Sequence, residues 1–372
     1  MIKEYYIHNF KNHADTTLKM GHLTLLTGMN GAGKSSVIQS MLALRESFLR
    51  SEKMESMVLR ADSINLGSSS DVFNQNGIDH QDYLHLSIRQ DDDNVFDFRY
   101  TYPITESTSL KALERIPYSL SQLQEIALMS DDFQYLSAFR DGPLASYPSD
   151  TDVVDEHRQL SQKNGLGEYV VYYLSRFGAE ELAIKDLAYN KGLALTLREQ
   201  TESWMDVISK GLVMKIDQEG MTYKLKFGYK VKGKTNRFFT AINNGFGIAY
   251  ILSVIVAILS AKPGALLLIE NPEAHIHPSG QSALMDLACR AASKGLQIVM
   301  ETHSDHIVNG ALVACKRGVM DSSDLSVYYF DKDENFNARA QKLEVGENGR
   351  LQRTPQGFFD QMDADLDVLF DI

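Results

Sequence analysis

Near its amino terminus the chain carries residues whose types and spacing fit a phosphate-binding loop. The stretch GMNGAGKSS matches the pattern G-x-x-x-x-G-K-[ST] at Gly28, Gly33, Lys34 and Ser35. Glycines let successive backbone N–H groups surround phosphate oxygens, the lysine reaches the β and γ phosphates, and the hydroxyl can bind Mg²⁺. A β-rich run before the loop and helical apolar spacing after it provide the strand and helix that this chemistry needs. We therefore predict a nucleoside-triphosphate site formed by Asn30, Gly31, Ala32, Gly33, Lys34, Ser35 and Ser36.

A site of this kind also needs a carboxylate at the end of a neighbouring buried strand to hold the magnesium. The apolar run ALLLIE ends at Glu270 and supplies one. A second apolar run, LQIVMETHSDH, leads to His303. A third segment, NNGFG, places Asn244, Gly245 and Gly247 just before a long apolar helix. Glycines there would let backbone N–H groups and the helix dipole approach a phosphate.

Taken in order, these segments resemble the head of ABC-type ATPases of the SMC-like branch. NFKNH stands at the opening strand, GMNGAGKSS at Walker A, NNGFG at a degenerate signature motif, LLLIENP at Walker B and THS at the switch-histidine loop. The runs IENPEAHIHPSGQ, ETHSDHI and GFFDQ are similar to stand-alone, OLD-like AAA family ATPases of bacterial anti-phage defence operons. The resemblance covers residues 1–75 and 236–372. It implies an α/β fold, an ABC-type P-loop ATPase head with a mixed sheet around the P-loop helix and a largely helical insertion.

The resemblance implies ATP as the nucleotide, Ser35 and Glu270 as Mg²⁺ ligands, and Asn271 at the position of the general base. An amide can orient water but cannot accept its proton. General-base help is typically worth about 10²–10⁴ in rate, so we expect slow hydrolysis unless Glu273 or His303 substitutes. The signature also departs from LSGGQ, with an asparagine where a serine would contact the γ-phosphate.

Two further candidates compete with ordinary structural roles. Asp71 or Gln75 in LGSSSDVFNQ could form the glutamine loop of the family, although such runs are common turns. Arg140 follows a strand-like run and could contact a phosphate or a partner, but surface salt bridging is the usual role of such an arginine.

The pattern of segments divides one composite ATPase domain into four parts. Residues 1–103 are expected to form the amino-terminal lobe with Walker A, and residues 104–235 a mainly helical insertion that ends in a basic hairpin. Residues 236–335 would form the carboxyl-terminal lobe with the signature, Walker B and the switch histidine. Residues 336–372 would form a tail helix. The insertion has no sustained heptad repeat, so a long coiled-coil arm is not expected.

The composition is that of a globular chain, with 372 residues, 44% of them hydrophobic, and a net charge of −12. This charge disfavours attraction of nucleic acid to the whole surface. One basic segment, YKLKFGYKVKGKTNR, predicts a hairpin whose basic face could bind nucleic acid or an acidic partner. Solvated lysines that protect an edge strand are the simpler explanation. The basic residues are Lys224, Lys226, Lys230, Lys232, Lys234 and Arg237.

No segment predicts export or a membrane span. The start MIKEYYIHNF lacks a basic stretch followed by an apolar core, and the apolar run at 247–261 is too short to cross a bilayer. Cys289 and Cys315 are too few for a disulfide framework and match no metal spacing. We expect a cytoplasmic protein with two buried, inert thiols.

These inferences favour one function and leave two others open. The resemblance implies an Mg-ATP-binding and ATP-hydrolysing head that pairs as a homodimer or higher homo-oligomer around ATP. It also implies the sensor or regulatory subunit of a bacterial anti-phage defence system that acts with a separate effector protein. OLD-family nucleases carry a Toprim domain after the ATPase, but the tail here is too short for one, and Asp331 and Asp333 alone are weak evidence for it. The alternatives are a RecF-like or SMC-like DNA-repair ATPase that binds DNA directly, and a scaffold that hydrolyses ATP very slowly.

Overall fold

The centre of the protein is a six-stranded mixed sheet with the strand order β16-β15-β3-β14-β13-β8. The computed structural model describes residues 1–75, 83–235, 237–355, 357–359, 366 and 369. Neighbouring strands from β15 to β8 pair in parallel, and β16 is antiparallel to β15. The strands are β3 (Leu23–Gly28), β8 (Phe133–Leu136), β13 (Leu266–Glu270), β14 (Gln297–Glu301), β15 (Leu325–Lys332) and β16 (Ala338–Leu343).

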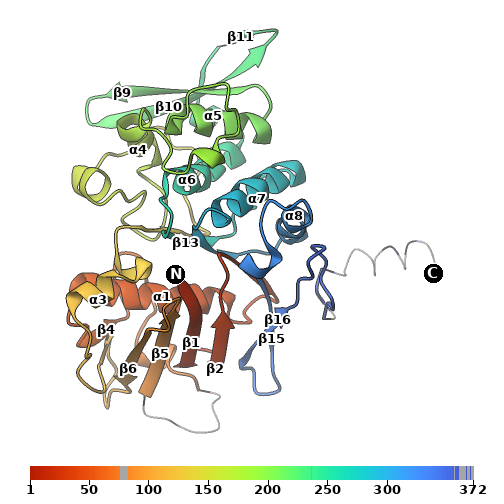
Figure 1. Cartoon of the computed structure of the whole chain (residues 1–372). Coiled ribbons are helices and arrows are strands. Elements are labelled where there is room, and N and C mark those ends of the chain that lie inside the picture. The colour runs from red at the N-terminus through yellow and green to blue at the C-terminus, as the bar shows by residue number, and fades with distance from the viewer. Residues whose placement is uncertain (76–82, 236, 356, 360–365, 367–368, 370–372) are drawn as a thin grey trace.

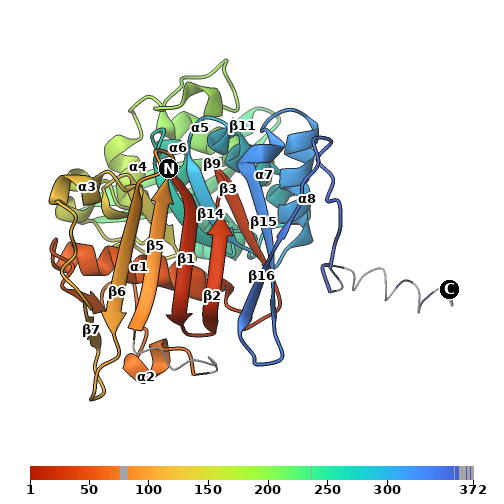
Figure 2. The same cartoon turned by 60° about the horizontal axis from the view of Figure 1, so that its bottom comes forward.

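Two separate cores cover the two faces of this sheet, so its central strands are apolar almost throughout. On one face lie helix α1 (Lys34–Arg50) and an antiparallel sheet of order β2-β1-β5-β6 (Figure 2). On the other face lie the helices α4 to α8 (Figure 1). Because side chains alternate along a strand, Leu267 and Ile269 of β13 enter the helical core, while Leu266 and Leu268 enter the other. Both faces of the central sheet are therefore covered by buried apolar side chains.

The remaining elements complete these layers. The antiparallel sheet consists of β1 (Ile2–Phe10), β2 (His13–Lys19), β5 (Tyr83–Gln90) and β6 (Val95–Thr101). The helical layer consists of α4 (Val170–Phe177), α5 (Leu197–Ile208), α6 (Phe246–Ser260), α7 (Pro278–Ala292) and α8 (Asp305–Lys316). The other elements are β4 (Ser56–Val58), α2 (Ser69–Val72), β7 (Ser109–Lys111), α3 (Leu120–Gln124), β9 (Leu212–Glu219), β10 (Thr222–Val231), β11 (Lys234–Thr235) and β12 (Phe239–Thr240).

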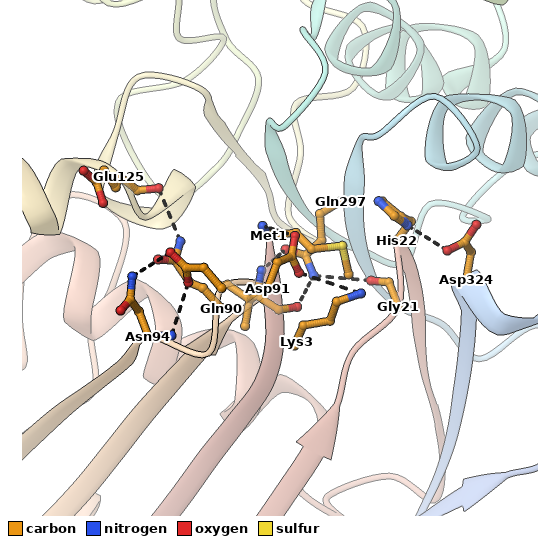
Figure 3. Close-up of polar contacts among 12 residues, drawn as sticks. Met1, Lys3, Gly21, His22, Gln90, Asp91, Asn94, Glu125, Gln297 and Asp324 are labelled. Carbon is orange, nitrogen blue, oxygen red and sulfur yellow. Dashed lines mark hydrogen bonds and ion pairs between the residues drawn. The ribbon is translucent and has the colours of Figure 1, made fainter.

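A buried glutamine joins the amino-terminal sheet to the central sheet at the edge where the parallel strands begin (Figure 3). The amide of Gln297 accepts from the N–H of Ile2 at 2.9 Å and donates to the carbonyls of Ile2 at 2.6 Å and Gly21 at 3.3 Å. Beside it, the Met1 ammonium lies 2.9 Å from Asp91 Oδ2. Because Gln297 is only 1% exposed, these bonds satisfy backbone groups that water cannot reach.

The expected helical insertion contains a strand of the central sheet. Residues 133–136 form β8, which pairs with β13 from Leu266 to Ile269, so the range 104–235 is not a separate insertion throughout. The run FQYL is too short for its periodicity to separate strand from helix, and the exposed edge of β13 decides its conformation. The range also contains β7, β9, β10 and β11, and its longest helix is α5 with 12 residues.

The basic segment does form a hairpin, as predicted, at the outer end of the helical layer (Figure 1). Lys232 and Gly233 both have positive φ, the geometry of a two-residue hairpin turn. At the base of the hairpin, acidic residues of β9 neutralise the charge of the lysines of β10. Lys224 Nζ lies 2.6 Å from Glu219, and Lys226 Nζ lies 2.8 Å from Asp217. The expected basic face is thus reduced to the tip.

The carboxyl-terminal part begins as a strand rather than a helix. Residues 338–343 form β16, which extends the central sheet and lies beside β2 (Figure 2). Most of the predicted tail helix at 358–369 lies outside the described residues. Asp331 pairs with Arg339, and Asp333 Oδ1 accepts from the N–H groups of Asn335 and Asn337 at 2.8 Å each. Both aspartates therefore stabilise the hairpin formed by β15 and β16.

The described part of the chain contains no helix that is both long and apolar enough to cross a membrane. The long apolar run forms α6, whose 15 residues are almost all buried between the central sheet and its neighbouring helices. Cys289 and Cys315 are buried and free.

Candidate functional site

The parallel strands bring the candidate residues to one edge of the sheet, because all of their carboxyl ends lie there. The phosphate loop follows β3, Glu270 ends β13, and His303 follows β14. The loop turns sharply into α1, with Gly28, Gly31 and Gly33 at positive φ. At Gly28 a Cβ atom would lie 2.2 Å from the carbonyl oxygen of Phe330, so a larger residue would push β15 away.

Lys34 lies across the loop that it follows. Its Nζ donates to the carbonyls of Gly28 at 2.9 Å and Met29 at 2.8 Å, and the residue is 3% exposed. Burial lowers the pKa of this ammonium. The lysine and the amino end of α1 together place positive charge at the centre of the loop, as anion binding requires.

The turn between β1 and β2 supports the loop from the other side. His13 is fully buried, and its Nε2 donates to the carbonyl of Gly33 at 3.0 Å. Burial lowers the pKa of His13 to about 4, so the imidazole is neutral near pH 7. A Cβ on Gly33 would lie 2.9 Å from His13 Nε2. The motif NFKNH thus contributes a supporting residue that sequence reasoning did not assign.

Ser35 contacts a carboxylate that the sequence did not reveal. Its Oγ donates to Glu301 Oε1 at 2.9 Å, whereas the carboxylate predicted to bind Mg²⁺ together with Ser35 was Glu270. Glu301 and Glu270 are register neighbours at the ends of β14 and β13. Both oxygens of Glu270 accept from the β8 side, one from the Tyr135 hydroxyl at 3.2 Å and the other from the N–H of Ala138 at 3.1 Å. Glu301 separates Glu270 from the loop because β14 lies between β3 and β13.

Three carboxyl groups crowd this edge, and their ionisation is disfavoured. Burial, and then the charge of Glu270, raise the pKa of Glu301 to about 7. Burial also raises the pKa values of Glu270 and Glu273. Glu301 Oε2 and Asn271 Oδ1 are buried and have no hydrogen-bond partner among the described residues. Oxygen atoms of this kind suit a hard cation such as Mg²⁺, so the residues fit the metal that the resemblance implies.

Asn271 and Glu273 hold the loop after β13 in place. Asn271 adopts φ 43°, and its N–H donates to the carbonyl of Glu301 at 2.8 Å. Glu273 Oε1 accepts from the N–H of His303 at 2.7 Å, which ties the Walker B loop to the switch loop. Burial, and then the charge of Lys34, lower the pKa of His303. Asn271 therefore faces the site, and Glu273 braces it.

Ser35 and residues at and after the ends of β13 and β14 line a cavity of about 460 Å³. Its wall includes Ser35, Gln39, Ser63, Asn65, Tyr135, Ser137, Phe139, Asn164, Glu270, Asn271, Glu301 and His303. Glu273 does not belong to this wall, and neither do Asn244, Gly245 and Gly247. The predicted glutamine-loop residues are used locally, since Asp71 Oδ2 accepts from the N–H of Ser68 at 2.8 Å and Gln75 donates to the carbonyl of Ser70 at 2.9 Å.

The signature segment leads into α6, with Gly245 at the cap. Gly247 packs inward, because a Cβ atom there would lie 2.1 Å from the carbonyl oxygen of His275. Gly245 has open space around it, with no atom within 4 Å of a Cβ position. His275 contacts the ring of Phe246 with centroids 4.6 Å apart, and His277 caps α7 by accepting from the N–H of Ser279 at 3.3 Å. Both histidines thus have structural roles.

Comparison with protein families identifies the class of this site. Residues 23–309 match the family described as "AAA domain, putative AbiEii toxin, Type IV TA system". The chain belongs to this AAA family. Residues 320–369 match a second family, described as "Protein of unknown function (DUF3696)". No curated protein matches the chain.

Solved structures of SMC heads share the fold. One, an SMC head bound to the C-winged helix domain of ScpA, is 13% identical, with 93% of this chain and 98% of that chain covered and a TM-score of 0.53. Another, from Pyrococcus furiosus and with an extended coiled coil bound to the C-terminal domain of ScpA, is 12% identical, with 100% and 98% covered and a TM-score of 0.50. The predicted ABC-type α/β ATPase head is confirmed, and this fold supports ATP binding and hydrolysis.

Proposed function

We propose that the cavity beside the phosphate loop binds Mg-ATP and hydrolyses it slowly, with Ser35 and Glu301 as the metal-binding side chains. The observation that carries this proposal is the 2.9 Å hydrogen bond from Ser35 Oγ to Glu301 Oε1 at the foot of the loop. Glu270, which was predicted as the metal ligand, already accepts two hydrogen bonds, so we assign it a supporting role behind Glu301. When bound, Mg²⁺ would neutralise phosphate charge and help to orient the terminal phosphate.

The chain's own groups divide the remaining work. The loop N–H groups and the start of α1 bind phosphate oxygens, and Lys34 turns from the loop carbonyls to the terminal phosphates. The Asn271 amide orients the attacking water but cannot take its proton. Slow turnover follows from this substitution, and it suits a protein that uses nucleotide occupancy as a signal.

We further propose that the protein is the regulatory ATPase of a bacterial defence system that acts through a separate effector protein. The OLD-like resemblance supports this role, and so does the toxin–antitoxin wording of the matching family. Head-to-tail pairing around ATP is part of the same proposal. The exposed start of α6 supports it, because Gly245 and Asn244 lie outside the cavity of their own chain.

Phosphate release under multiple-turnover conditions tests the activity. Lys34→Ala should abolish turnover, because it removes the point charge aimed at the terminal phosphates. Lys262→Ala is the matched control, since Lys262 is a solvent-exposed lysine that pairs with Asp132. Equal activity of the two variants would overturn the site assignment.

A direct DNA clamp is the second candidate, and the lysines at the hairpin tip are the observation that favours it. Binding to duplex DNA that weakens steeply with salt would support this candidate. The neutralised hairpin base argues against a large basic footprint. A non-hydrolysing scaffold, the third candidate, is excluded if the wild type releases many phosphates per protein molecule.

A further inference from the structure

Arg140 is a buried cation without a carboxylate in direct contact among its described hydrogen-bond partners. The residue is 3% exposed, which corrects the expected surface salt bridge. Its Nη1 donates to the carbonyls of Ser137 at 2.7 Å and Glu270 at 2.6 Å, and its Nη2 donates to the carbonyl of Asn271 at 3.0 Å. Burying a charge in this way is unfavourable, and the Nε of Arg140 has no hydrogen-bond partner among the described residues, which adds to the cost. The guanidinium fork therefore has a specific task at this position.

The role of Arg140 follows from the backbone carbonyls to which its guanidinium donates. The carbonyls of Glu270 and Asn271 both point to the same guanidinium, although Asn271 adopts φ 43° in the left-handed region. The side chains of both residues line the cavity. Fixing the two carbonyls fixes the peptide planes on both sides of the Asn271 Cα and so the direction of its Cα–Cβ bond, because each peptide plane is rigid. A lysine has a single ammonium on a flexible stem and cannot hold three carbonyls in this fork geometry.

Arg140 also connects these residues to the start of α6. Its guanidinium lies 4.1 Å from the centre of the Tyr250 ring, and the Tyr250 hydroxyl donates to the carbonyl of Ala138 at 3.0 Å. Tyr250 contacts the ring of His275 with centroids 5.6 Å apart, and His275 in turn meets Gly247. The first turns of α6, the loop after β13 and the end of β8 thus pack around one cation.

We propose that Arg140 is a positioning residue that aligns Glu270 and Asn271 for hydrolysis and couples this alignment to the start of α6. It rests on the proposed ATPase function. Arg140 does not line the cavity and acts on it through the backbone carbonyls of Glu270 and Asn271, so it sets turnover rather than nucleotide affinity. A partner that contacts the exposed start of α6 would act on the loop after β13 through Tyr250 and Arg140.

The chain offers a matched control in Arg45, another buried arginine that bonds only carbonyls. Arg45 Nη1 donates to the carbonyls of Leu128 and Ser130 at 2.7 Å each, and its guanidinium lies 4.2 Å from the centre of the Phe133 ring. It is 6% exposed and lies at the opposite end of β8 from Arg140. Loss of either arginine should therefore disturb packing to a similar degree, but only Arg140 bonds the carbonyls of Glu270 and Asn271.

The experiment compares Arg140→Lys and Arg45→Lys in the full chain by steady-state phosphate release and by equilibrium binding of ATP. For Arg140→Lys we expect kcat to fall by about 10²-fold, the usual effect of a small misplacement, with the dissociation constant of ATP changed less than about threefold. For Arg45→Lys both quantities should stay near wild type. Free guanidinium ion at low concentration should restore turnover to Arg140→Ala, while ethylammonium should not.

Tyr250→Leu provides a second measurement in case Arg140→Lys folds poorly. It removes the ring that covers the guanidinium and should lower kcat with ATP binding retained. Combining it with Arg140→Lys should add little, because both act through one contact. Wild-type kcat in both single variants, or equal loss of kcat in Arg45→Lys, would overturn the positioning role while leaving the ATPase proposal intact. No turnover by the wild type would overturn both.

Discussion

Replacing Glu301 by glutamine should stabilise the nucleotide-free protein at neutral and alkaline pH while removing magnesium-dependent function. The side chain is 6% exposed and lies beside Glu270, so its ionised form is unfavourable in the folded state. Its pKa is raised from 4.5 to about 7. Each pKa unit corresponds to about 1.4 kcal/mol, so this shift gives a penalty of roughly 3–4 kcal/mol once the group is ionised.

The direction of the pH effect follows from the same shift. Between pH 4.5 and about 7 the folded protein holds a proton on Glu301 that the unfolded chain has released. Stability therefore falls as pH rises through this window, and the full penalty is present above it. Glutamine carries no charge and can keep a hydrogen bond with Ser35. The free energy of unfolding of Glu301→Gln should exceed that of the wild type at about pH 8 and approach it at about pH 5.

Urea unfolding without nucleotide or divalent cations measures this difference at the two pH values. Comparing variant with wild type at each pH cancels the titration of other groups, provided that the slopes of unfolding free energy against urea agree. A difference of the same size at both pH values would show that the ionisation of Glu301 is not suppressed by burial. A less stable variant at the higher pH would mean that the carboxylate gains more from its contacts than it loses by desolvation.

Three further changes test separate parts of the site. Asn271→Glu should speed phosphate release by up to about 10²-fold if the missing base limits turnover, and Glu273→Gln should leave the rate nearly unchanged if Glu273 only braces the N–H of His303. Gly245→Trp should abolish turnover but spare ATP binding if the start of α6 completes a partner's site. Mixing this variant with Lys34→Ala should restore about a quarter of wild-type turnover once the subunits have exchanged. A mixture that stays inactive contradicts a composite site. Reversing Lys232 and Lys234 to glutamate should weaken any binding to DNA or an acidic partner without affecting ATP, as measured by titration at several salt concentrations. Lys230 is left in place there because its charge acts on Glu202.

The phosphate loop and the Walker B strand could be predicted because each is encoded in a short run of residues. The glycines at positive φ, Lys34 and the end of β13 at Glu270 all follow from local patterns. A strand-like run before Arg140 was expected, but the place of this run, β8, in the central sheet could not be predicted in this way. Its four residues join the sheet because β13 offers an open edge. The same holds for β16, which pairs with β15 in what was expected to be a tail.

Gly247 was assigned to the degenerate signature segment, but its contacts in the fold are within its own chain. The signature pattern indicated a glycine that lets a partner's phosphate approach the start of α6. In the fold, the missing Cβ makes room for the carbonyl of His275 in the same chain, so a large residue there would damage the loop after β13 directly. Gly245, two residues earlier and open to solvent, is the position that tests the partner.

Glu301 was missed for a related reason. In the sequence it ends the apolar run LQIVME directly before THS, which is the same local signal that Glu270 has at the end of ALLLIE, so the sequence alone does not choose between them. Its importance arises from strand order, because β14 lies between β3 and β13 and therefore places Glu301 closer to Ser35 than Glu270 lies. The amide at Asn271 then stands beside a carboxylate from the neighbouring strand. The position that holds an amide along the chain has a carboxylate beside it across the sheet, and the charge balance of the site has to be judged from the register of the strands.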